Sequence, residues 1–309
     1  MANTLIEIVG VRKRFGDIKA VDGVDLSIQE GELFGLIGHN GAGKTTLFKM
    51  LLGLLPASSG EIRIGGQPVR GEAFRQVRRS IGYLPENLAL YDNLSGLETL
   101  RFFARLKGAD TGACMALLAR VGLAAAAGKR VRGYSKGMRQ RLGFAQALLG
   151  SPRLLFLDEP TNGLDPHGIL EFYSILNELR SGGVTVLLTS HILAEIQQRV
   201  DRLALMRDGG LQALGTVQAL REAQDLPLNL RIVLRPGAAG VADSLRHILA
   251  AQGIGSVEIS GDVVRFACAR ARKMVLLTAL SGLGEGIADI EVHEASLEEV
   301  YLGYADGVS

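Results

Sequence analysis

The sequence has few cysteines and almost no net charge, and each shortage excludes a class of protein. Cys114 and Cys268 are far apart and have no cluster of histidines or cysteines beside them, so we expect reduced structural thiols and no metal cluster. Lys and Arg number 34 against 32 Asp and Glu, which leaves a net charge of +2. Without a basic field, the composition predicts no nucleic-acid partner.

Long apolar runs are also absent. Hydrophobic residues make up 47% of the chain, yet charges or glycines interrupt every run, as Arg120 does within 116–127. None approaches the ~18 residues needed to cross a bilayer. The amino terminus lacks the charged head and apolar centre of a secretory signal. We therefore expect a cytoplasmic chain whose surplus apolar surface meets another protein.

Residues 38–45 match the phosphate-loop pattern G-x-x-x-x-G-K-[ST]. A short apolar strand is expected before the loop, at 32–37, and a helix after it, at 46–52. Glycines let backbone N–H groups face a polyphosphate, Lys44 can reach its terminal phosphates, and Thr45 can hold Mg²⁺. A glycine-rich turn that carries a lysine by accident is the alternative. The expected nucleotide-binding residues are Gly38, His39, Asn40, Gly41, Ala42, Gly43, Lys44, Thr45 and Thr46.

Two carboxylates follow a second apolar strand at 153–157. In open α/β sheets, ligands bind at the carboxyl ends of such strands. Asp158 fits a Mg²⁺ ligand that acts through water, and Glu159 fits a general base. A helix cap would explain one acid but not both. His191 ends a further strand at 184–189 and is expected to contact the γ-phosphate.

The elements around these motifs predict an α/β phosphate-loop core with two additions. Strands at 5–9, 21–28 and 60–65 form an antiparallel β-layer, and Phe15, between the first two, fits either adenine stacking or an edge position. Helices dominate a subdomain at about 88–150, in which Ser135 is a helix N-cap. The candidate partner-facing residues of this subdomain are Phe102, Phe103 and Leu106, for which core packing is the alternative.

A second domain is expected after a polar stretch at 221–227. The pattern of 228–304 reads β-α-β-β-α-β, which is typical of a small α+β ferredoxin-like domain. The predicted domains are therefore 1–222 and 227–309. Because no catalytic constellation lies in the second, a regulatory or docking role is our hypothesis for it.

In their order along the chain, these motifs resemble the nucleotide-binding subunit of an ATP-binding-cassette (ABC) transporter. The resemblance implies ATP and Mg²⁺ as cofactors, ATP hydrolysis by Glu159 and His191, and a homodimer that works with integral membrane permease subunits on the cytoplasmic face of the inner membrane. Ser135 and Gly137 would contact the γ-phosphate across the dimer, and Asp165 would couple the two sites. The family's Leu-Ser-Gly-Gly-Gln signature departs here at three positions, and its Mg²⁺-contacting glutamine is Glu86. The three signature departures are Tyr134, Lys136 and Met138.

A narrower resemblance concerns cargo. Several segments look like the ATPase subunit of the copper-processing transporter of nitrous oxide reductase maturation, which implies copper delivery, denitrification and a periplasmic partner. Residues 290–301 resemble the carboxyl-terminal extension of exporter subunits. The alternatives are an exporter of another cargo (drug, lipid or haem), a soluble ABC ATPase acting on ribosomes or DNA, and a module that binds ATP without hydrolysing it. The segments are 38–40, 83–87, 94–100, 103–108 and 134–150.

Overall fold

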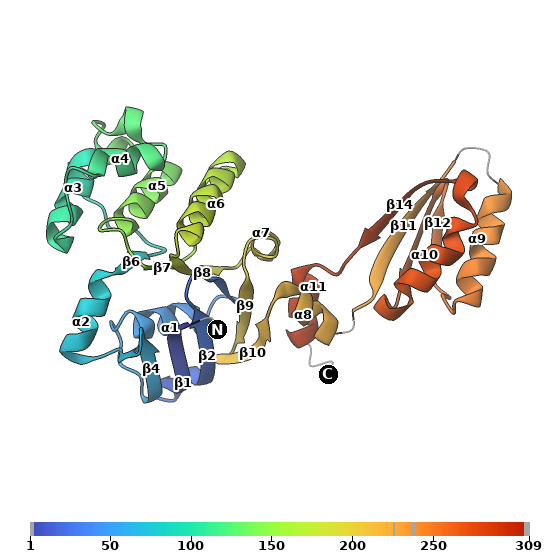
Figure 1. The fold of residues 1–309 in the computed structure, drawn as a ribbon, viewed down its shortest axis with the longest axis horizontal. Coiled ribbons are helices and arrows are strands. Elements are labelled where there is room, and N and C mark those ends of the chain that lie inside the picture. The colour runs from blue at the N-terminus through green and yellow to red at the C-terminus, as the bar shows by residue number, and fades with distance from the viewer. Residues whose placement is uncertain (1–2, 225, 236–238, 306–309) are drawn as a thin grey trace. The chain divides into compact units, whose positions relative to one another are not determined.

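A computed structural model describes residues 3–224, 226–235 and 239–305 (Figure 1). Contacts divide the chain into two compact units, residues 1–216 and 217–309. Helix α8 (Val217–Ala223) falls in the second unit, whereas the sequence analysis drew the boundary after residue 222. Each unit is described by itself below.

The first unit is built on a six-stranded sheet in the order β10-β9-β3-β8-β7-β6, which is parallel except for β10. Every residue of β3, β7 and β8 is buried, as expected for central parallel strands with both faces covered. Phe48 of the first helix packs edge-on against Phe156 of β7, with ring centroids 5.5 Å apart. The elements are β3 (Leu33–Ile37), α1 (Lys44–Leu51), β6 (Ile81–Leu84), β7 (Leu154–Leu157), α6 (Pro166–Ser181), β8 (Thr185–Ser190), α7 (Leu193–Ile196), β9 (Arg202–Arg207) and β10 (Gly210–Gly215).

The expected antiparallel layer is present and is larger than the sequence indicated. Its order is β2-β1-β4-β5. The first strand continues to Phe15 because residues 11–15 pair with β2, so the segment interpreted as a connector is strand. Helix α2 was not expected from the sequence, because it is short and has only three apolar side chains, Ala73, Phe74 and Val77, among mostly charged and polar residues. The elements are β1 (Thr4–Phe15), β2 (Ile18–Gln29), β4 (Ser59–Ile64), β5 (Gln67–Pro68) and α2 (Gly71–Arg79).

The helical part of the first unit begins at a capping box. The Ser95 side chain accepts a hydrogen bond from the N–H of Glu98, whose carboxylate accepts one from the N–H of Ser95. Lys107, at the end of the same helix, donates to the carbonyls of Ile81 (3.0 Å) and Leu149 (2.7 Å) and thereby ties this part to β6. The elements are α3 (Gly96–Lys107), α4 (Cys114–Arg120), the short 3₁₀ turns η1 (Ala124–Ala126) and η2 (Val131–Gly133), and α5 (Lys136–Ala147).

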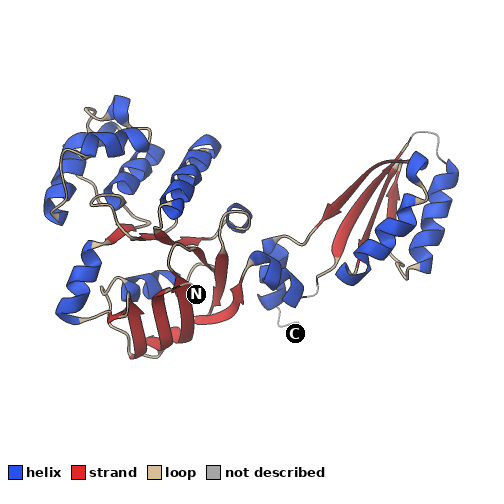
Figure 2. Cartoon of the chain, in the orientation of Figure 1, coloured by secondary structure: helices blue, strands red, loops and turns tan. Residues whose placement is uncertain are grey.

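The second unit has the expected β-α-β-β-α-β order, with an antiparallel sheet β12-β13-β11-β14 (Figure 2). Alternate residues of β11 and β13 pack against Leu245, Leu249, Leu276 and Leu280 of two helices and leave the other sheet face open. The elements are α8, β11 (Leu228–Leu234), α9 (Ala239–Ala251), β12 (Val257–Ser260), β13 (Val263–Cys268), η3 (Arg270–Arg272), α10 (Lys273–Ser281), η4 (Gly284–Gly286), β14 (Ile287–His293) and α11 (Leu297–Ala305).

Candidate functional site

The loop between β3 and α1 curls in a way that only glycine allows at two positions. Gly43, the residue before α1, has φ 104°, and a Cβ there would lie 2.4 Å from the carbonyl oxygen of Ala20. At Gly38 a Cβ would lie 2.4 Å from the carbonyl oxygen of Met206. The curled backbone and the amino terminus of α1 form a concave array of N–H donors, which is the usual cradle for a phosphate group.

Lys44, the first residue of α1, is buried beneath this loop. Its Nζ donates hydrogen bonds to the carbonyl oxygens of Gly38 (2.5 Å) and His39 (3.1 Å). Burial lowers the pKa of Lys44, while the carboxylates of Glu159 and Asp158 oppose that shift. The site thus contains a cation whose acceptors are neutral carbonyls, which suits it to an incoming polyanion.

Asp158 and Glu159 follow β7 directly and share one partner on β8. The Thr189 hydroxyl donates to Asp158 Oδ1 at 2.7 Å and accepts a hydrogen bond from the Glu159 N–H at 2.9 Å. Thr189 is fully buried. Burial raises the pKa of Asp158, the negative charges of Glu86 and Glu159 raise it further, and the Thr189 hydrogen bond opposes them. Thr189 was not singled out from the sequence, where its only signal was a hydroxyl near the end of a strand rich in Val and Leu.

The Glu159 carboxylate forms a hydrogen bond with His191. This contact is expected because Glu159 follows β7 and His191 follows β8, two parallel strands that end at the same edge of the sheet. His191 Nδ1 lies 2.7 Å from Glu159 Oε2. The turn after the acids is fixed by Gln140 of α5, whose Nε2 donates to the carbonyl of Pro160 at 2.9 Å. Gln140 is buried and was not singled out from the sequence. A carboxylate next to an imidazole can accept a proton from water, which is the chemistry of a general base.

These groups line one pocket of about 440 Å³. Four of its lining residues were not singled out from the sequence. Ile18, Lys19 and Ala20 come from the start of β2, and Asp208 comes from the β9–β10 turn. The expected residues that line it are His39, Asn40, Gly41, Ala42, Gly43, Lys44, Thr45, Thr46, Glu86, Asp158, Glu159 and His191. The pocket therefore combines phosphate-loop donors, carboxylates and the imidazoles of His39 and His191.

Phe15 lies beside this pocket rather than in its lining. It pairs in register with Ile18, which does line the pocket. Its ring is half-exposed, and Lys13 Nζ lies 5.2 Å from the ring centroid. The ring is therefore available for stacking and is no core residue.

Ser135, Gly137 and Asp165 lie outside the pocket lining. The Ser135 hydroxyl accepts a hydrogen bond from the Met138 N–H at 3.2 Å and caps α5. Asp165 caps α6 and is exposed. A Cβ at Gly137 would lie 2.8 Å from the carbonyl oxygen of Gly163, so glycine permits a close approach of two segments there. The exposed amino terminus of α5 is thus a second set of N–H donors, separate from the phosphate loop.

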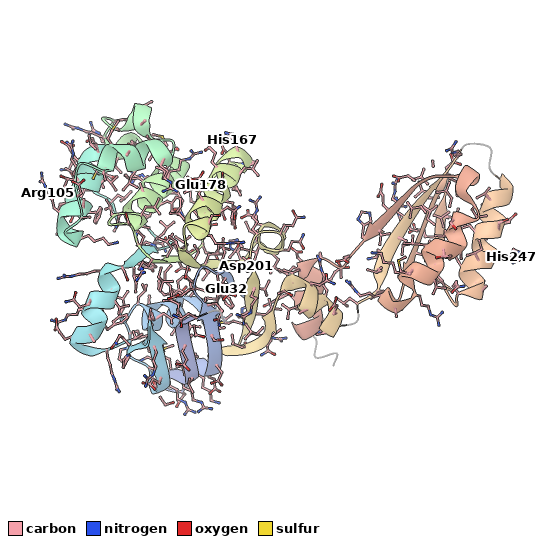
Figure 3. All side chains as sticks on the ribbon, in the orientation of Figure 1. Glu32, Arg105, His167, Glu178, Asp201 and His247 are labelled. Carbon is pink, nitrogen blue, oxygen red and sulfur yellow. The ribbon has the colours of Figure 1, made fainter. Side chains whose placement is uncertain are left out.

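Acids at the opposite end of the sheet serve the fold instead. Glu32 and Asp201 directly precede β3 and β9 (Figure 3). Glu32 accepts a hydrogen bond from the Gln29 N–H and pairs with Arg202 at 3.2 Å. Asp201 accepts one from the Leu33 N–H at 2.9 Å. The acids that line the phosphate-loop pocket lie at the carboxyl ends of strands, where ligands bind in open α/β sheets.

The donor set fits Mg²⁺ bound through water and phosphate better than a metal held by protein alone. Within the described ranges, no group of three or more His, Cys, Asp or Glu residues could hold a metal ion. The pocket offers the hard oxygen ligands that Mg²⁺ prefers, the Thr45 hydroxyl and the Asp158 carboxylate.

Comparison with known proteins identifies the family. The ABC transporter family model matches residues 21–162. Daunorubicin resistance ATP-binding protein DrrA3 of Streptomyces coeruleorubidus is 38% identical over 319 residues, which cover 98% of this chain and 96% of that protein. The chain belongs to the ABC transporter ATP-binding subunits, and it is an ATP-binding ATPase.

Further relatives agree with this assignment. Bacitracin transport ATP-binding protein BcrA of Bacillus licheniformis is 40% identical and covers 68% of this chain and 69% of its own length. A solved ATP-binding subunit of an ABC transporter is 31% identical, with a TM-score of 0.65 over 71% of this chain and 93% of that structure. A dimeric bacterial ABC transporter cassette is 25% identical, with a TM-score of 0.64 over 69% of this chain and 99% of that structure.

No helix in the described part of the chain is both long and apolar enough to cross a membrane.

Proposed function

We propose that the chain powers a separate membrane-embedded permease, with Glu159 as the general base of ATP hydrolysis. The observation that carries this assignment is the hydrogen-bonded set around Glu159, in which Thr189 holds its backbone and His191 its carboxylate. The carboxylate takes the proton of the attacking water. His191 orients the carboxylate and is the group that we assign to the γ-phosphate.

ATP binding is assigned to the phosphate loop and its neighbours. The N–H groups of residues 38–46 and the amino terminus of α1 hold the phosphates, and Lys44 gives its hydrogen bonds to the β- and γ-phosphates. The half-exposed Phe15 stacks on the adenine. The Thr45 hydroxyl would hold Mg²⁺, together with Asp158 and Glu86 through water. When bound, Mg²⁺ neutralises charge on the phosphate oxygens.

A homodimer completes the site. Ser135 and Gly137 lie outside the pocket of their own chain, on an exposed helix terminus that suits an anion. We assign them to the γ-phosphate of ATP bound to a second copy, and Asp165 to the coupling of the two sites. The dimeric form of a solved relative supports this arrangement.

The permease contact is assigned to an aromatic cluster of the helical part. Tyr91 packs edge-on against Phe102 and Phe102 against Phe103, with centroids 5.5 Å and 5.3 Å apart. Tyr91 is 54% and Leu106 70% exposed, which leaves apolar surface for a partner. The subunit would then be peripheral, on the cytoplasmic face of the inner membrane.

An amphipathic organic compound is the cargo that we favour, because the DrrA3 relative matches 98% of the chain, second unit included. Copper delivery for nitrous oxide reductase, with a periplasmic partner, is the second candidate. It is favoured by the segments 38–40, 83–87 and 134–150 named above. Vesicles that carry the permease subunits would decide between them by ATP-dependent uptake of daunorubicin or of copper.

The proposed ATP hydrolysis by Glu159 is tested with the purified chain and its Glu159→Gln variant. The rate of hydrolysis of each is measured with and without permease-containing membranes. The matched control is Glu178→Gln, which removes an exposed carboxylate of α6 (Figure 3). We expect Glu159→Gln to lose hydrolysis and trap an ATP-bound dimer, and the membranes to change the wild-type rate. Normal hydrolysis by Glu159→Gln would refute the base assignment, and indifference to membranes would favour a soluble ATPase acting on ribosomes or DNA.

A further inference from the structure

The open face of the second unit's sheet carries an unusual row of charges. Residues in direct register across its four strands are Glu258, Arg265, Arg231 and Glu291. The row lies on the face away from the helices, because the neighbouring positions in β11 and β13 pack into the core. Two arginines therefore stand directly opposite each other on adjacent strands, an arrangement that destabilises a sheet unless an anion compensates it.

Only one of the two arginines is compensated within the protein. Arg231 Nη1 lies 2.6 Å from Glu291 Oε1, and His293 Nε2 lies 3.1 Å from the other oxygen of that carboxylate. The Arg265 side chain, in contrast, forms no hydrogen bond or ion pair with any residue that the structure describes, although Glu258 is its register partner. Its guanidinium is left with its five donors for another molecule.

A cavity of about 770 Å³ lies over this row. Both arginines and Glu258 line it, together with Asn229, His293 and Ala267. One wall is a pair of loops held together by a hydrogen bond from Arg272 Nη1 to the carbonyl of Gln252. A cavity of this volume lies within the range of small-molecule sites.

We propose that this cavity binds a small organic acid through a single carboxylate or phosphate group, which Arg265 and Arg231 contact together. The charges set the number of anionic groups. Arg231 is already neutralised by Glu291, so Arg265 supplies the positive charge at the centre of the row. Arg272, whose hydrogen bond goes to a neutral carbonyl, adds positive charge at the cavity wall. Glu258 disfavours a second negative group on its side. This inference is independent of the function proposed for the first unit.

The test uses benzoate as the probe and benzamide as its neutral isostere, added to the full chain with ¹³C-labelled alanine methyl groups. The Ala267 methyl lies in the cavity lining and is exposed, so its resonance reports on this site and not on the nucleotide pocket. We expect benzoate to shift this resonance in a saturable way and benzamide to leave it in place. Substitution Ala267→Ser assigns the resonance.

The matched variants are Arg265→Gln and Arg246→Gln. Arg246 is an exposed arginine of α9 paired with Asp243, outside the cavity lining. Arg265→Gln is expected to weaken benzoate binding about tenfold, as the loss of a charge-assisted hydrogen bond does, and Arg246→Gln to leave it within about twofold. Glu258→Gln should tighten it.

Three results would overturn the proposal. They are equal binding of benzoate and benzamide, equal affinities of the two arginine variants, and a shift produced by vesicles of anionic phospholipid but by no free acid. The last would assign the arginines to a membrane surface instead.

Discussion

Thr189→Val tests whether one hydroxyl holds the two acids of the site in place. Valine has nearly the shape of threonine but neither donates nor accepts, so the change removes the hydrogen bonds to Asp158 (2.7 Å) and from the Glu159 N–H (2.9 Å) while the strand stays packed. The Glu159 N–H is then left buried without its partner.

The loss of stability follows from that unsatisfied group. A buried donor without a partner costs about 1–3 kcal/mol, and we expect Thr189→Val to lower the free energy of unfolding by about 2 kcal/mol. Thr185→Val is the matched control, because Thr185 is buried on the same strand and its hydroxyl accepts a hydrogen bond from the Gly31 N–H at 2.9 Å, away from the pocket. The control should lose about 1 kcal/mol.

Catalysis separates the two valine variants. A base displaced by a fraction of an ångström to 1 Å loses roughly 10- to 100-fold in rate, so kcat should fall by that factor in Thr189→Val and stay near the wild-type value in Thr185→Val. Thr189→Ser keeps the hydroxyl and should recover most of kcat. Steady-state ATP hydrolysis at saturating ATP and Mg²⁺ measures these values. Equal kcat in the two valine variants would refute a positioning role for Thr189.

The pH profile gives an independent readout. The Thr189 hydrogen bond lowers the pKa of Asp158 against the raising effect of burial, so its removal raises that pKa further. In the role that we propose, Asp158 must be ionised to hold Mg²⁺, and a carboxylate with a higher pKa becomes protonated at a higher pH. The acid limb of the kcat profile should therefore move to higher pH in Thr189→Val and remain in place in Thr189→Ser.

Three further predictions concern single positions. The pKa of Asp158 is raised in the folded state, so the ionised carboxylate lowers the stability of the fold at pH values above that pKa. Without nucleotide, Asp158→Asn should therefore have a higher Tm than the wild type near pH 8, and the difference should disappear toward acid pH. A difference in Tm that stays constant across pH would contradict this. Lys107→Met removes the hydrogen bonds to the carbonyls of Ile81 in β6 and of Leu149, which follows α5, and should lower the free energy of unfolding in urea by about 2–3 kcal/mol. Substitution of the exposed Arg105 of the same helix by Met is the control (Figure 3), and equal losses in the two variants would count against the prediction. Gly137→Ala brings a Cβ to 2.8 Å from the Gly163 carbonyl oxygen and so disturbs the amino terminus of α5. In a Glu159→Gln background, ATP-dependent dimerisation should therefore weaken, as measured by size-exclusion chromatography. An unchanged dimer would show that the segments around Gly137 and Gly163 can move apart.

Local patterns in the sequence predicted most of what positions the site. The phosphate loop, the acids after an apolar strand and the order of the second unit's elements depend on neighbouring residues, and all are present. Thr189, Gln140 and Asp208 could not be predicted in this way, because each acts on a residue or a pocket that the chain reaches only through folding. The Thr189–Asp158 bond, for example, joins residues 31 positions apart.

The backbone at Glu159 shows why the two adjacent acids can act in one pocket. In a continuing strand, successive side chains point to opposite faces, so Asp158 and Glu159 would diverge. Glu159 instead has φ 49°, one of three positive values among the described non-glycine residues, and both carboxylates line the pocket. Such a conformation costs about 1–3 kcal/mol and persists only where its surroundings enforce it.

Those surroundings are hydrogen bonds on both sides of the strained residue. Thr189 accepts from the Glu159 N–H, and Gln140 donates to the carbonyl of Pro160. Asp208, another of the three, lines the same pocket from the β9–β10 turn. The positive φ of Asp208 is explained by its two-residue hairpin turn with Gly209 (φ 81°), where both central residues usually have positive φ. At Glu159 the hydrogen bonds hold the strained backbone, because a relaxed strand would point the proposed general base away from the phosphate loop.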